Sequence, residues 1–305
     1  MSLALQQRSK ISIFLQAIRA FSLVAAVIPV LVGSSLALYY QGKVDWYLLP
    51  IIIICSLLFQ SATNMINDYY DYKKGVDQKH TYGSSRVLVD EVMKPKSLIR
   101  MGLIVMGIGL ALGMLLVYVR GIPMLILGVA GALGGYLYSG FMGYKYFALG
   151  DIMVFLLMGP LMVIGSYFAL TGNYYYELWI ESIPVGCLVL SILQANNHRD
   201  IHNDSSAKIK TVSILIGYKI SKIEYFSLVI SAYASVVVMI AVKMISPLAA
   251  IVLLALPMAL KNMKLMKNST PDNSESIAML DAASAQHHLL FGVLYSIGII
   301  IGYYF

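Results

Sequence analysis

Long apolar segments separated by shorter polar stretches dominate the pattern along this chain. A bilayer core of about 30 Å is crossed by a helix of roughly 20 apolar residues. Nine segments approach or exceed that length: 12–39, 46–69, 98–118, 122–139, 147–170, 178–197, 224–242, 246–261 and 287–305. We therefore predict an all-α integral membrane protein, a bundle of nine transmembrane helices that forms a single domain over residues 1–305.

Composition supports this interpretation and excludes a water-soluble body. Of the residues, 59% are hydrophobic and 12% are charged, whereas soluble domains contain about 25% charged residues. The net charge of +7 does not indicate a nucleic-acid partner, because the basic residues gather in loops on one membrane face. Cys55 and Cys187 both lie in apolar runs, which favours buried hydrophobic packing over a disulfide or a metal site.

The distribution of Lys and Arg predicts the orientation of the helices. Besides the N-terminal segment, four loops on one face carry nearly all of them: 70–97, 140–146, 198–223 and 262–286. The other face has only Lys43, Arg120 and Lys243. The positive-inside rule then predicts a multi-pass protein of the cell (plasma) membrane with a cytoplasmic N-terminus and an external C-terminus. Nothing in the sequence indicates an oligomeric state.

The first of two acidic clusters reads NMINDYYDYKKGVD and lies at the end of the second apolar segment. Asn64, Asp68 and Asp71 are spaced i, i+4 and i+7, so they share one helix face. Asn67 and Asp71 share a face in the same way. Asp77 follows beyond the expected end of the helix.

The second cluster, NNHRDIHND, lies at the end of the sixth apolar segment. Here Asn196, Asp200 and Asp204 repeat the helical stripe, with Asn197 and Arg199 beside it. Both clusters open long polar loops on the predicted cytoplasmic face. Long loops in compact proteins are often functional.

Two such carboxylate stripes indicate a divalent cation. Ionisable residues at the end of a membrane helix are functional candidates by default, because their burial is costly. Oxygen ligands select Mg²⁺, which typically bridges carboxylates to substrate phosphates. The predicted metal ligands are Asn67, Asp68, Asp71, Asp77, Asp200 and Asp204. Nearby cations suited to phosphate are Lys73, Lys74, Arg86, Arg199, Lys208 and Lys210.

Other interpretations stay open at this point. The four histidines His198, His202, His287 and His288 could bind zinc, but their spacing favours polar loop residues instead. A cation-coupled transporter also carries intramembrane carboxylates, although its sites lie near the bilayer midplane. A third possibility is a membrane scaffold without activity.

Across almost its whole length the chain resembles the UbiA superfamily of intramembrane prenyltransferases. That superfamily has nine transmembrane helices and two Asp-rich motifs, after the second and sixth helices. Its first motif, N-D-x-x-D followed by a further Asp, is matched by Asn67, Asp68, Asp71 and Asp77. Its second motif, D-x-x-x-D, is matched by Asp200 and Asp204.

Within the superfamily the chain is most similar to 1,4-dihydroxy-2-naphthoate polyprenyltransferases of menaquinone biosynthesis. The step of six residues from Asp71 to Asp77 resembles that subgroup; in 4-hydroxybenzoate and haem transferases the last Asp comes four residues on, where this chain has Gly75. The stretches GSSRVLVDE, DIMVFLLMGPL and NNHRDIHNDSSAKIKT are also similar. One departure is that Lys208 and Ile209 replace the Gly-Lys pair of the subgroup's A-G-K-x-T.

The resemblance implies a Mg²⁺-dependent transfer of a polyprenyl chain from an allylic prenyl diphosphate to 1,4-dihydroxy-2-naphthoate. Other aromatic acceptors, such as 4-hydroxybenzoate or homogentisate, are the nearest alternatives. The implied catalytic residues are Asp68, Asp71, Asp200 and Asp204. The implied substrate-binding residues are Asn64, Asn67, Lys73, Arg86, Tyr138, Lys145, Asn196, Asn197, Arg199 and Lys208, and Asp151 is a further candidate for cavity or acceptor contacts.

Overall fold

Helices make up the regular structure of the protein, apart from two isolated β-bridges. The computed structural model describes residues 9–79, 81–141 and 143–305. The α-helices are α1 (Lys10–Ala17), α2 (Val24–Gln41), α3 (Leu49–Lys74), α4 (Pro95–Arg120), α5 (Ile122–Leu137), α6 (Gly150–Leu156), α7 (Met162–Thr171), α8 (Glu177–Glu181), α9 (Ile183–Arg199), α10 (Ile201–Ser206), α11 (Val212–Ala241), α12 (Leu256–Asn268) and α13 (Leu280–Tyr304). The 3₁₀ helices are η1 (Ala20–Leu23), η2 (Trp46–Leu48), η3 (Tyr144–Tyr146), η5 (Pro247–Ala255) and η6 (Ser274–Ile277), and η4 (Leu157–Leu161) is a π-helical turn.

Eight helical stretches in the described residues are long and apolar enough to cross a membrane. They are Ala20–Gln41, Trp46–Lys74, Pro95–Arg120, Gly150–Thr171, Glu177–Arg199, Val212–Ala241, Pro247–Asn268 and Ser274–Tyr304. The expected fourth segment corresponds to α5, which is apolar but has only 16 residues. The predicted all-α membrane architecture is confirmed, with eight full-length candidates and one shorter helix.

The first predicted segment, 12–39, is not one continuous helix. α1 ends at Ala17, and Arg19 adopts a left-handed conformation with φ of 52° before η1 and α2 begin. For a residue other than glycine this conformation costs about 1–2 kcal/mol. The break turns Arg19 toward α3, where its guanidinium pairs with the Asp68 carboxylate. Hydropathy alone cannot reveal such a break, because the residues around it remain apolar.

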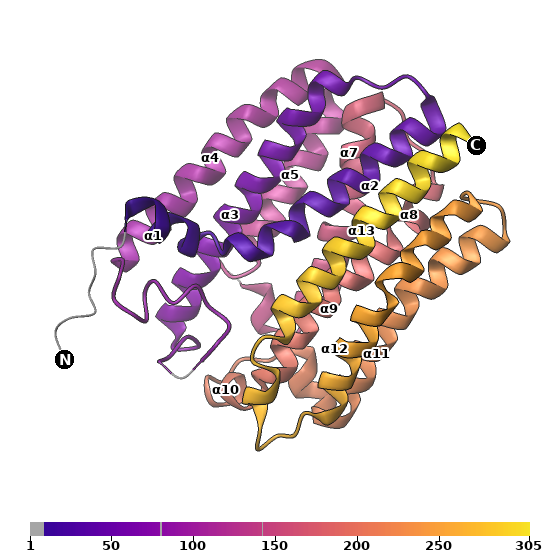
Figure 1. Cartoon of the computed structure of the whole chain (residues 1–305). Helices are drawn as coiled ribbons and strands as arrows, with labels where there is room; N and C mark the ends of the chain where they lie inside the picture. The colour runs from indigo at the N-terminus through magenta and orange to yellow at the C-terminus, as the bar shows by residue number, and fades with distance from the viewer. Residues whose placement is uncertain (1–8, 80, 142) are drawn as a thin grey trace.

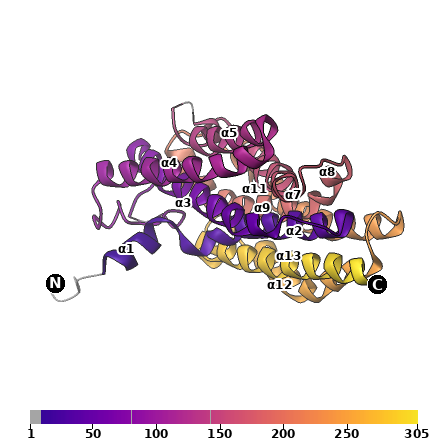
Figure 2. The same ribbon diagram turned by 90° about the horizontal axis from the view of Figure 1, so that it is seen from above.

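The helices pack around α9, which contacts α11, α13 and α6. α3 packs against α4, and α2 lies between α13 and α7. Seen from above, α4 and α5 lie on one side and α12 and α13 on the other, with α2, α3 and α9 between them (Figure 2). The loops that follow α3 and α9 lie at the same end of the bundle as α1 and α10 (Figure 1).

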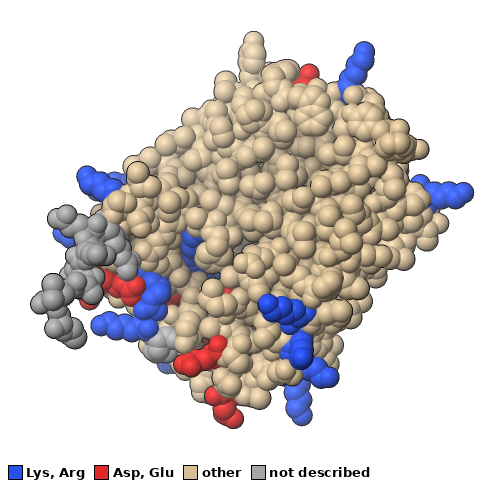
Figure 3. Space-filling model, viewed as in Figure 1, with Lys and Arg blue, Asp and Glu red and all other residues tan. Residues whose placement is uncertain are grey.

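Charged side chains avoid the middle of the molecular surface. In Figure 3 most Lys, Arg, Asp and Glu side chains lie toward the two ends of the bundle, separated by a broad surface without charge. Exposed apolar side chains of the helices include Ile104, Leu115 and Ile126. Such a belt fits the hydrocarbon core of a bilayer.

Candidate active site

The first acidic cluster occupies the last turns of α3, and its polar side chains face inward. Asn64, Asn67, Asp68 and Asp71 are all buried. The Asn64 amide donates to the carbonyl oxygen of Ile18 at 2.8 Å and to Ser22 Oγ at 2.9 Å. Asn64 therefore ties α3 to the break after α1.

Asp68 and Asp71 each have a basic partner from another part of the chain. Asp68 pairs with Arg19 and accepts a hydrogen bond from the Ser85 amide at 3.1 Å. Asp71 accepts from Lys145 Nζ at 2.6 Å and from the Tyr146 hydroxyl at 2.8 Å. These partners compensate the cost of burying the two carboxylates.

Lys145 also joins Asn67 to the site. The Asn67 side-chain oxygen accepts from Lys145 Nζ at 2.6 Å and from Ser139 Oγ at 2.5 Å. The segment between α5 and α6 contacts the first acidic cluster, and a β-bridge between Phe147 and Lys210 holds it against the chain just after α10.

The second acidic cluster surrounds one buried guanidinium. Arg199 donates to both oxygens of Asp200, at 3.0 and 2.7 Å. It also donates to Asn196 at 2.5 Å and to Asp281 of α13 at 3.1 Å. Arg199 thus fixes the end of α9 against α13, and its charge is already shared by two carboxylates.

The loop after α3 lies directly over this second cluster. A Cβ placed on Gly83 would lie 3.0 Å from the Asn196 side-chain oxygen and 3.2 Å from Asp200 Oδ2. The Tyr82 ring lies 5.9 Å from the Arg199 guanidinium carbon. Residues that are far apart in the sequence therefore form one site, as the two stripes predicted.

Two carboxylates of the site, Asp77 and Asp204, form no ion pair within the described residues. Burial and the charges of Asp71 and Asp68 raise the pKa of Asp77 to about 8. Burial and the charge of Asp200 raise the pKa of Asp204 to about 7. Carboxyl groups thus outnumber the cations Arg19, Lys145 and Arg199 at this end of the cavity, so the metal-free site retains protons that a bound cation would displace.

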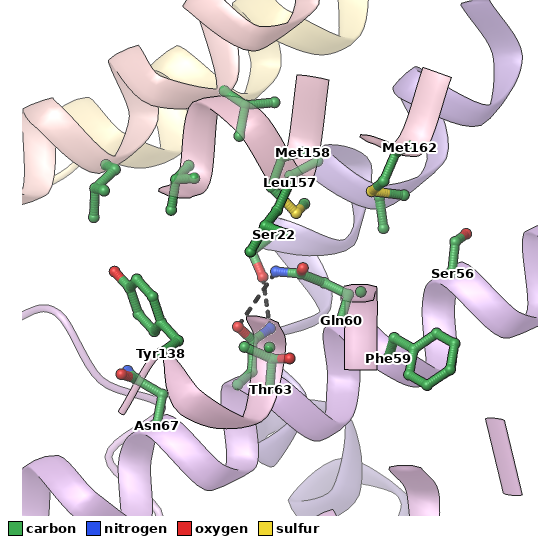
Figure 4. Close-up of a pocket in the computed structure, with 18 of the residues that line it drawn as sticks. Ser22, Ser56, Phe59, Gln60, Thr63, Asn67, Tyr138, Leu157, Met158 and Met162 are labelled. Atoms are coloured by element: carbon green, nitrogen blue, oxygen red, sulfur yellow. Dashed lines mark hydrogen bonds between the residues drawn. The ribbon is translucent and has the colours of Figure 1, made fainter. Parts of the chain in front are cut away.

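A cavity of about 410 Å³ connects both clusters to the apolar interior. Its polar end includes Arg19, Asp71, Asp77, Asp200 and Asp204. Farther in, side chains from α2 to α7 and α9 make the wall apolar. Figure 4 shows Phe59, Thr63 and Asn67 of α3 on one side, with Leu157, Met158 and Met162 on another and Tyr138 near Asn67.

The cavity wall contains many but not all of the predicted site residues. Those that line it are Asn64, Asn67, Asp71, Asp77, Tyr138, Lys145, Asn196, Asn197, Asp200 and Asp204. Asp68 and Arg199 do not line it: Asp68 pairs with Arg19, and Arg199 pairs with Asp200. Lys73 and Lys208 are exposed to solvent, while Arg86 pairs with Asp90 at 2.9 Å. Their substrate contacts stay predictions.

Two charged lining residues were missed from the sequence, Arg19 and Asp281. Arg19 sits inside a segment that reads as a plain membrane helix, and Asp281 precedes the last one. A charge within or beside an apolar segment is the signal that could have singled out both.

The donor set of the site fits Mg²⁺ when it is combined with a phosphorylated substrate. In the observed conformation, no group of three His, Cys, Asp or Glu side chains among the described residues is placed to hold an ion by itself. Mg²⁺ usually keeps waters and uses one or two carboxylates together with substrate phosphates. The unpaired carboxylates of Asp77 and Asp204, both at the cavity, match that requirement.

Comparison with known proteins agrees with this geometry. The model of the UbiA prenyltransferase family matches residues 26–282. The chain is 33% identical to 1,4-dihydroxy-2-naphthoate octaprenyltransferase of Bacillus subtilis over 98% of this chain and 96% of that protein. It is 32% identical to mouse (Mus musculus) UbiA prenyltransferase domain-containing protein 1 over 96% of this chain and 85% of that protein.

Solved structures share the fold. A UbiA homologue from Archaeoglobus fulgidus, bound to GPP and Mg²⁺, superposes with a TM-score of 0.63 at 16% identity, over 93% of this chain and 100% of that one. A homologue from Aeropyrum pernix without ligand gives a TM-score of 0.61 at 17% identity, over 93% and 97%. With the family model covering most of the chain, the protein belongs to the UbiA prenyltransferase family and is a multi-pass membrane prenyltransferase.

Proposed function

We propose that the protein transfers a polyprenyl chain from an allylic prenyl diphosphate to 1,4-dihydroxy-2-naphthoate, giving demethylmenaquinone, with Mg²⁺ as cofactor. The observation that carries this proposal is the single cavity that joins a carboxylate-rich end to an apolar interior. A prenyl diphosphate has the same division, with a charged head and an apolar tail.

The polar end of the cavity suits the diphosphate group. Arg19 and Lys145 both line it and supply positive charge. Bound Mg²⁺ would neutralise the charge that develops on the diphosphate as it leaves. The residues proposed to hold the ion, directly or through water, are Asn67, Asp68, Asp71, Asp77, Asp200 and Asp204.

The apolar part of the cavity suits the prenyl chain. On α3 the lining residues extend from Asp71 to Ile52, roughly 28 Å of helix at 1.5 Å per residue. Side chains such as Phe59, Met124 and Leu157 surround this space. They exclude water, which would otherwise trap the allylic cation formed as the diphosphate departs.

The acceptor is proposed from two observations. The relative from Bacillus subtilis is named a 1,4-dihydroxy-2-naphthoate octaprenyltransferase, and the step from Asp71 to Asp77 resembles that subgroup. The mouse relative carries a name that specifies no acceptor.

The proposal includes the orientation in the membrane. We infer that α5 is a ninth span, shorter than the others, because it is apolar and connects α4 to the loop that carries Lys145. With nine spans the two termini lie on opposite faces of the membrane. From the positions of Lys and Arg, we propose that the N-terminus and both acidic clusters are on the cytoplasmic side of the plasma membrane and that the C-terminus is outside.

An acceptor panel tests the proposed reaction. The purified protein in detergent is incubated with Mg²⁺, geranylgeranyl diphosphate and one of three acceptors: 1,4-dihydroxy-2-naphthoate, 4-hydroxybenzoate or homogentisate. We expect the highest kcat/KM with the naphthoate, with release of its carboxyl group as CO₂. A higher kcat/KM with either of the other two would refute the acceptor while leaving the prenyltransferase reaction intact.

A further inference from the structure

A buried carboxylate at the start of α6 has one oxygen that no described residue satisfies. Asp151 is 5% exposed, lines the cavity, and its Oδ2 atom accepts no hydrogen bond from the described residues. Leaving a buried acceptor of this kind unpaired costs about 1–3 kcal/mol. Because leaving Oδ2 unpaired is costly and Asp151 lines the cavity, we expect a ligand in the cavity to supply the missing hydrogen-bond donor.

The surroundings of Asp151 fix its orientation without occupying Oδ2. The Asn197 amide donates to the other oxygen, Oδ1, at 3.4 Å. Asn197 belongs to the second acidic cluster and also lines the cavity. Asp151 is thereby held in place by α9, with its free oxygen left for a molecule in the cavity.

The space beside Asp151 suits a flat aromatic ring. Val154 and Met158 lie three and seven residues further along, on the same helical face, and both line the cavity. Tyr138 lies beside the start of α6, because a Cβ on Gly150 would be 3.8 Å from its ring. An aromatic ring can pack on these side chains while a hydroxyl on its edge meets the carboxylate.

Asp151 is also close to the diphosphate end of the cavity. A Cβ on the preceding residue, Gly150, would lie 3.5 Å from Lys145 Cβ. Lys145 in turn contacts Asp71. An acceptor bound at Asp151 would therefore lie next to the allylic carbon of a prenyl diphosphate bound at Lys145 and Asp71.

We propose that Asp151 is the acceptor-binding carboxylate: its Oδ2 accepts the hydrogen bond of a ring hydroxyl and takes the hydroxyl proton during prenyl transfer. The inference rests on the proposed function, in which the acceptor is a hydroxylated aromatic. Asn197 acts as a positioning residue that holds the carboxylate.

The electrons and atoms of this step balance. The ring carbon that bears the carboxyl group bonds to the allylic carbon as the allylic carbon–oxygen bond breaks, and the electron pair of the broken bond leaves with the diphosphate. The hydroxyl proton moves to Asp151, so the ring carries a keto group. Loss of the carboxyl group as CO₂ returns its electron pair to the ring, and the keto oxygen recovers the proton from Asp151.

Asp151→Asn tests this role, because it keeps the size of the side chain and removes the charged acceptor. We expect kcat/KM for the naphthoate to fall about 10- to 100-fold, as for loss of a hydrogen bond to a charged group. The KM for geranylgeranyl diphosphate should change less than about twofold. The matched control is Glu181→Gln, since Glu181 is also a buried carboxylate with one unpaired oxygen but lies outside the cavity.

Two mono-O-methyl ethers of the naphthoate separate recognition from a structural effect. The unaltered protein should discriminate against the ether that lacks the hydroxyl bound by Asp151. That discrimination should disappear in Asp151→Asn and return at least partly in Asp151→Glu, which restores a carboxylate. A structural defect would lower activity with all acceptors alike, and it would weaken the increase in melting temperature caused by geranylgeranyl diphosphate with Mg²⁺.

The outcomes distinguish the two proposals. If the unaltered protein prenylates the naphthoate but Asp151→Asn retains its kcat/KM or its discrimination between ethers, the role of Asp151 is refuted and the proposed function stands. If the unaltered protein prenylates no hydroxylated aromatic, the proposed function and this inference fail together.

Discussion

Lys145 links the segment between α5 and α6 to the first acidic cluster, because one ammonium contacts both Asn67 and Asp71. Its side chain is 15% exposed and lines the cavity. Arg19 has the corresponding role for Asp68, with which it forms an ion pair. These two cations hold the stripe in place when no substrate is bound, and they are available to the phosphate groups when one is.

Replacing Lys145 by Gln should weaken binding of the prenyl diphosphate. We expect its KM to rise about 10-fold or more, since a charge-assisted hydrogen bond contributes about 1.5–3 kcal/mol. Steady-state kinetics at saturating acceptor measures the effect. Lys264→Gln, on an exposed part of α12, is the control, and an equal KM in both variants would exclude Lys145 as a phosphate contact.

The sequence identified the carboxylates better than the cations. Both aspartate stripes follow from helical spacing, which is a local property. The cations chosen for their nearness in sequence, Lys73 and Lys208, are exposed instead. Arg19 reaches the site through a tertiary contact with Asp68, and no local pattern encodes that contact.

Lys208 illustrates how a departure from a family pattern can be interpreted once the backbone is known. It follows the last turn of α10 and has a φ of 58°, the left-handed conformation that often terminates helices and favours glycine. The resembled subgroup has glycine at this position. The backbone at Lys208 thus has the left-handed conformation that glycine adopts most easily.

Lys208→Gly should therefore be tolerated. We expect a melting temperature equal to or above that of the unaltered protein, because relief of about 1 kcal/mol of left-handed strain offsets the greater chain entropy of glycine. Turnover should be unchanged within about twofold. A large rise in the KM for prenyl diphosphate would instead show that the Lys208 side chain binds phosphate, as its sequence position suggested.

α9 and the α6–η4–α7 span pack closely at a pair of glycines, Gly159 and Gly186. A Cβ on Gly159 would lie 2.8 Å from the Cα of Gly186. Gly159 lies within η4, a π-helical turn that also contains Pro160. Small residues allow close backbone packing between membrane helices. Here that packing joins two of the helical segments whose other residues line the cavity.

Gly159→Val should separate these helices. We expect the apparent melting temperature to fall by about 2–10 °C, the range for overpacking that costs about 1–3 kcal/mol. Gly107→Val on α4 is the matched control, since nothing lies within 4 Å of its added Cβ. Equal melting temperatures for the two variants would show that the glycine contact is not needed for stability.

The helix pattern predicts some spans more accurately than others. The segments 46–69, 98–118, 122–139, 147–170 and 178–197 match helical stretches to within five residues at each end, because hydrophobic length is the dominant signal in a bilayer. The other four segments differ by seven to thirteen residues at one end. The break at Arg19 and the π-helical turn at η4, which contains Pro160, lie inside apolar segments, so hydropathy alone does not locate them.

In the molecule as a whole, the carboxyl groups that outnumber the cations lie at one end of the cavity. Folding places Asp77 and Asp204 there with pKa values of about 8 and about 7, well above those of an unfolded chain. Between about pH 5 and 8 the folded protein therefore binds more protons than the unfolded chain. The stability of the metal-free protein should then fall as the pH rises through this range.

Mg²⁺ should reverse this trend. It binds the ionised carboxylates, so its stabilising effect grows with pH. We expect Mg²⁺ to raise the melting temperature more at pH 8 than at pH 6 in detergent, measured with and without EDTA. The double variant Asp77→Asn/Asp204→Asn should lose most of both pH effects. An equal or larger Mg²⁺ effect at pH 6 would contradict this account of the site.

The central claim is that the two aspartate clusters act together on a metal-bound prenyl diphosphate. The most direct measurement is the rate of prenyl transfer after removal of divalent cations with EDTA and again after titration with Mg²⁺, for the unaltered protein and for Asp71→Asn and Asp200→Asn. The account predicts no transfer without metal, full recovery with Mg²⁺, and a loss of at least about 100-fold in either variant at saturating Mg²⁺. Undiminished transfer in EDTA, or full activity in either variant, would contradict it.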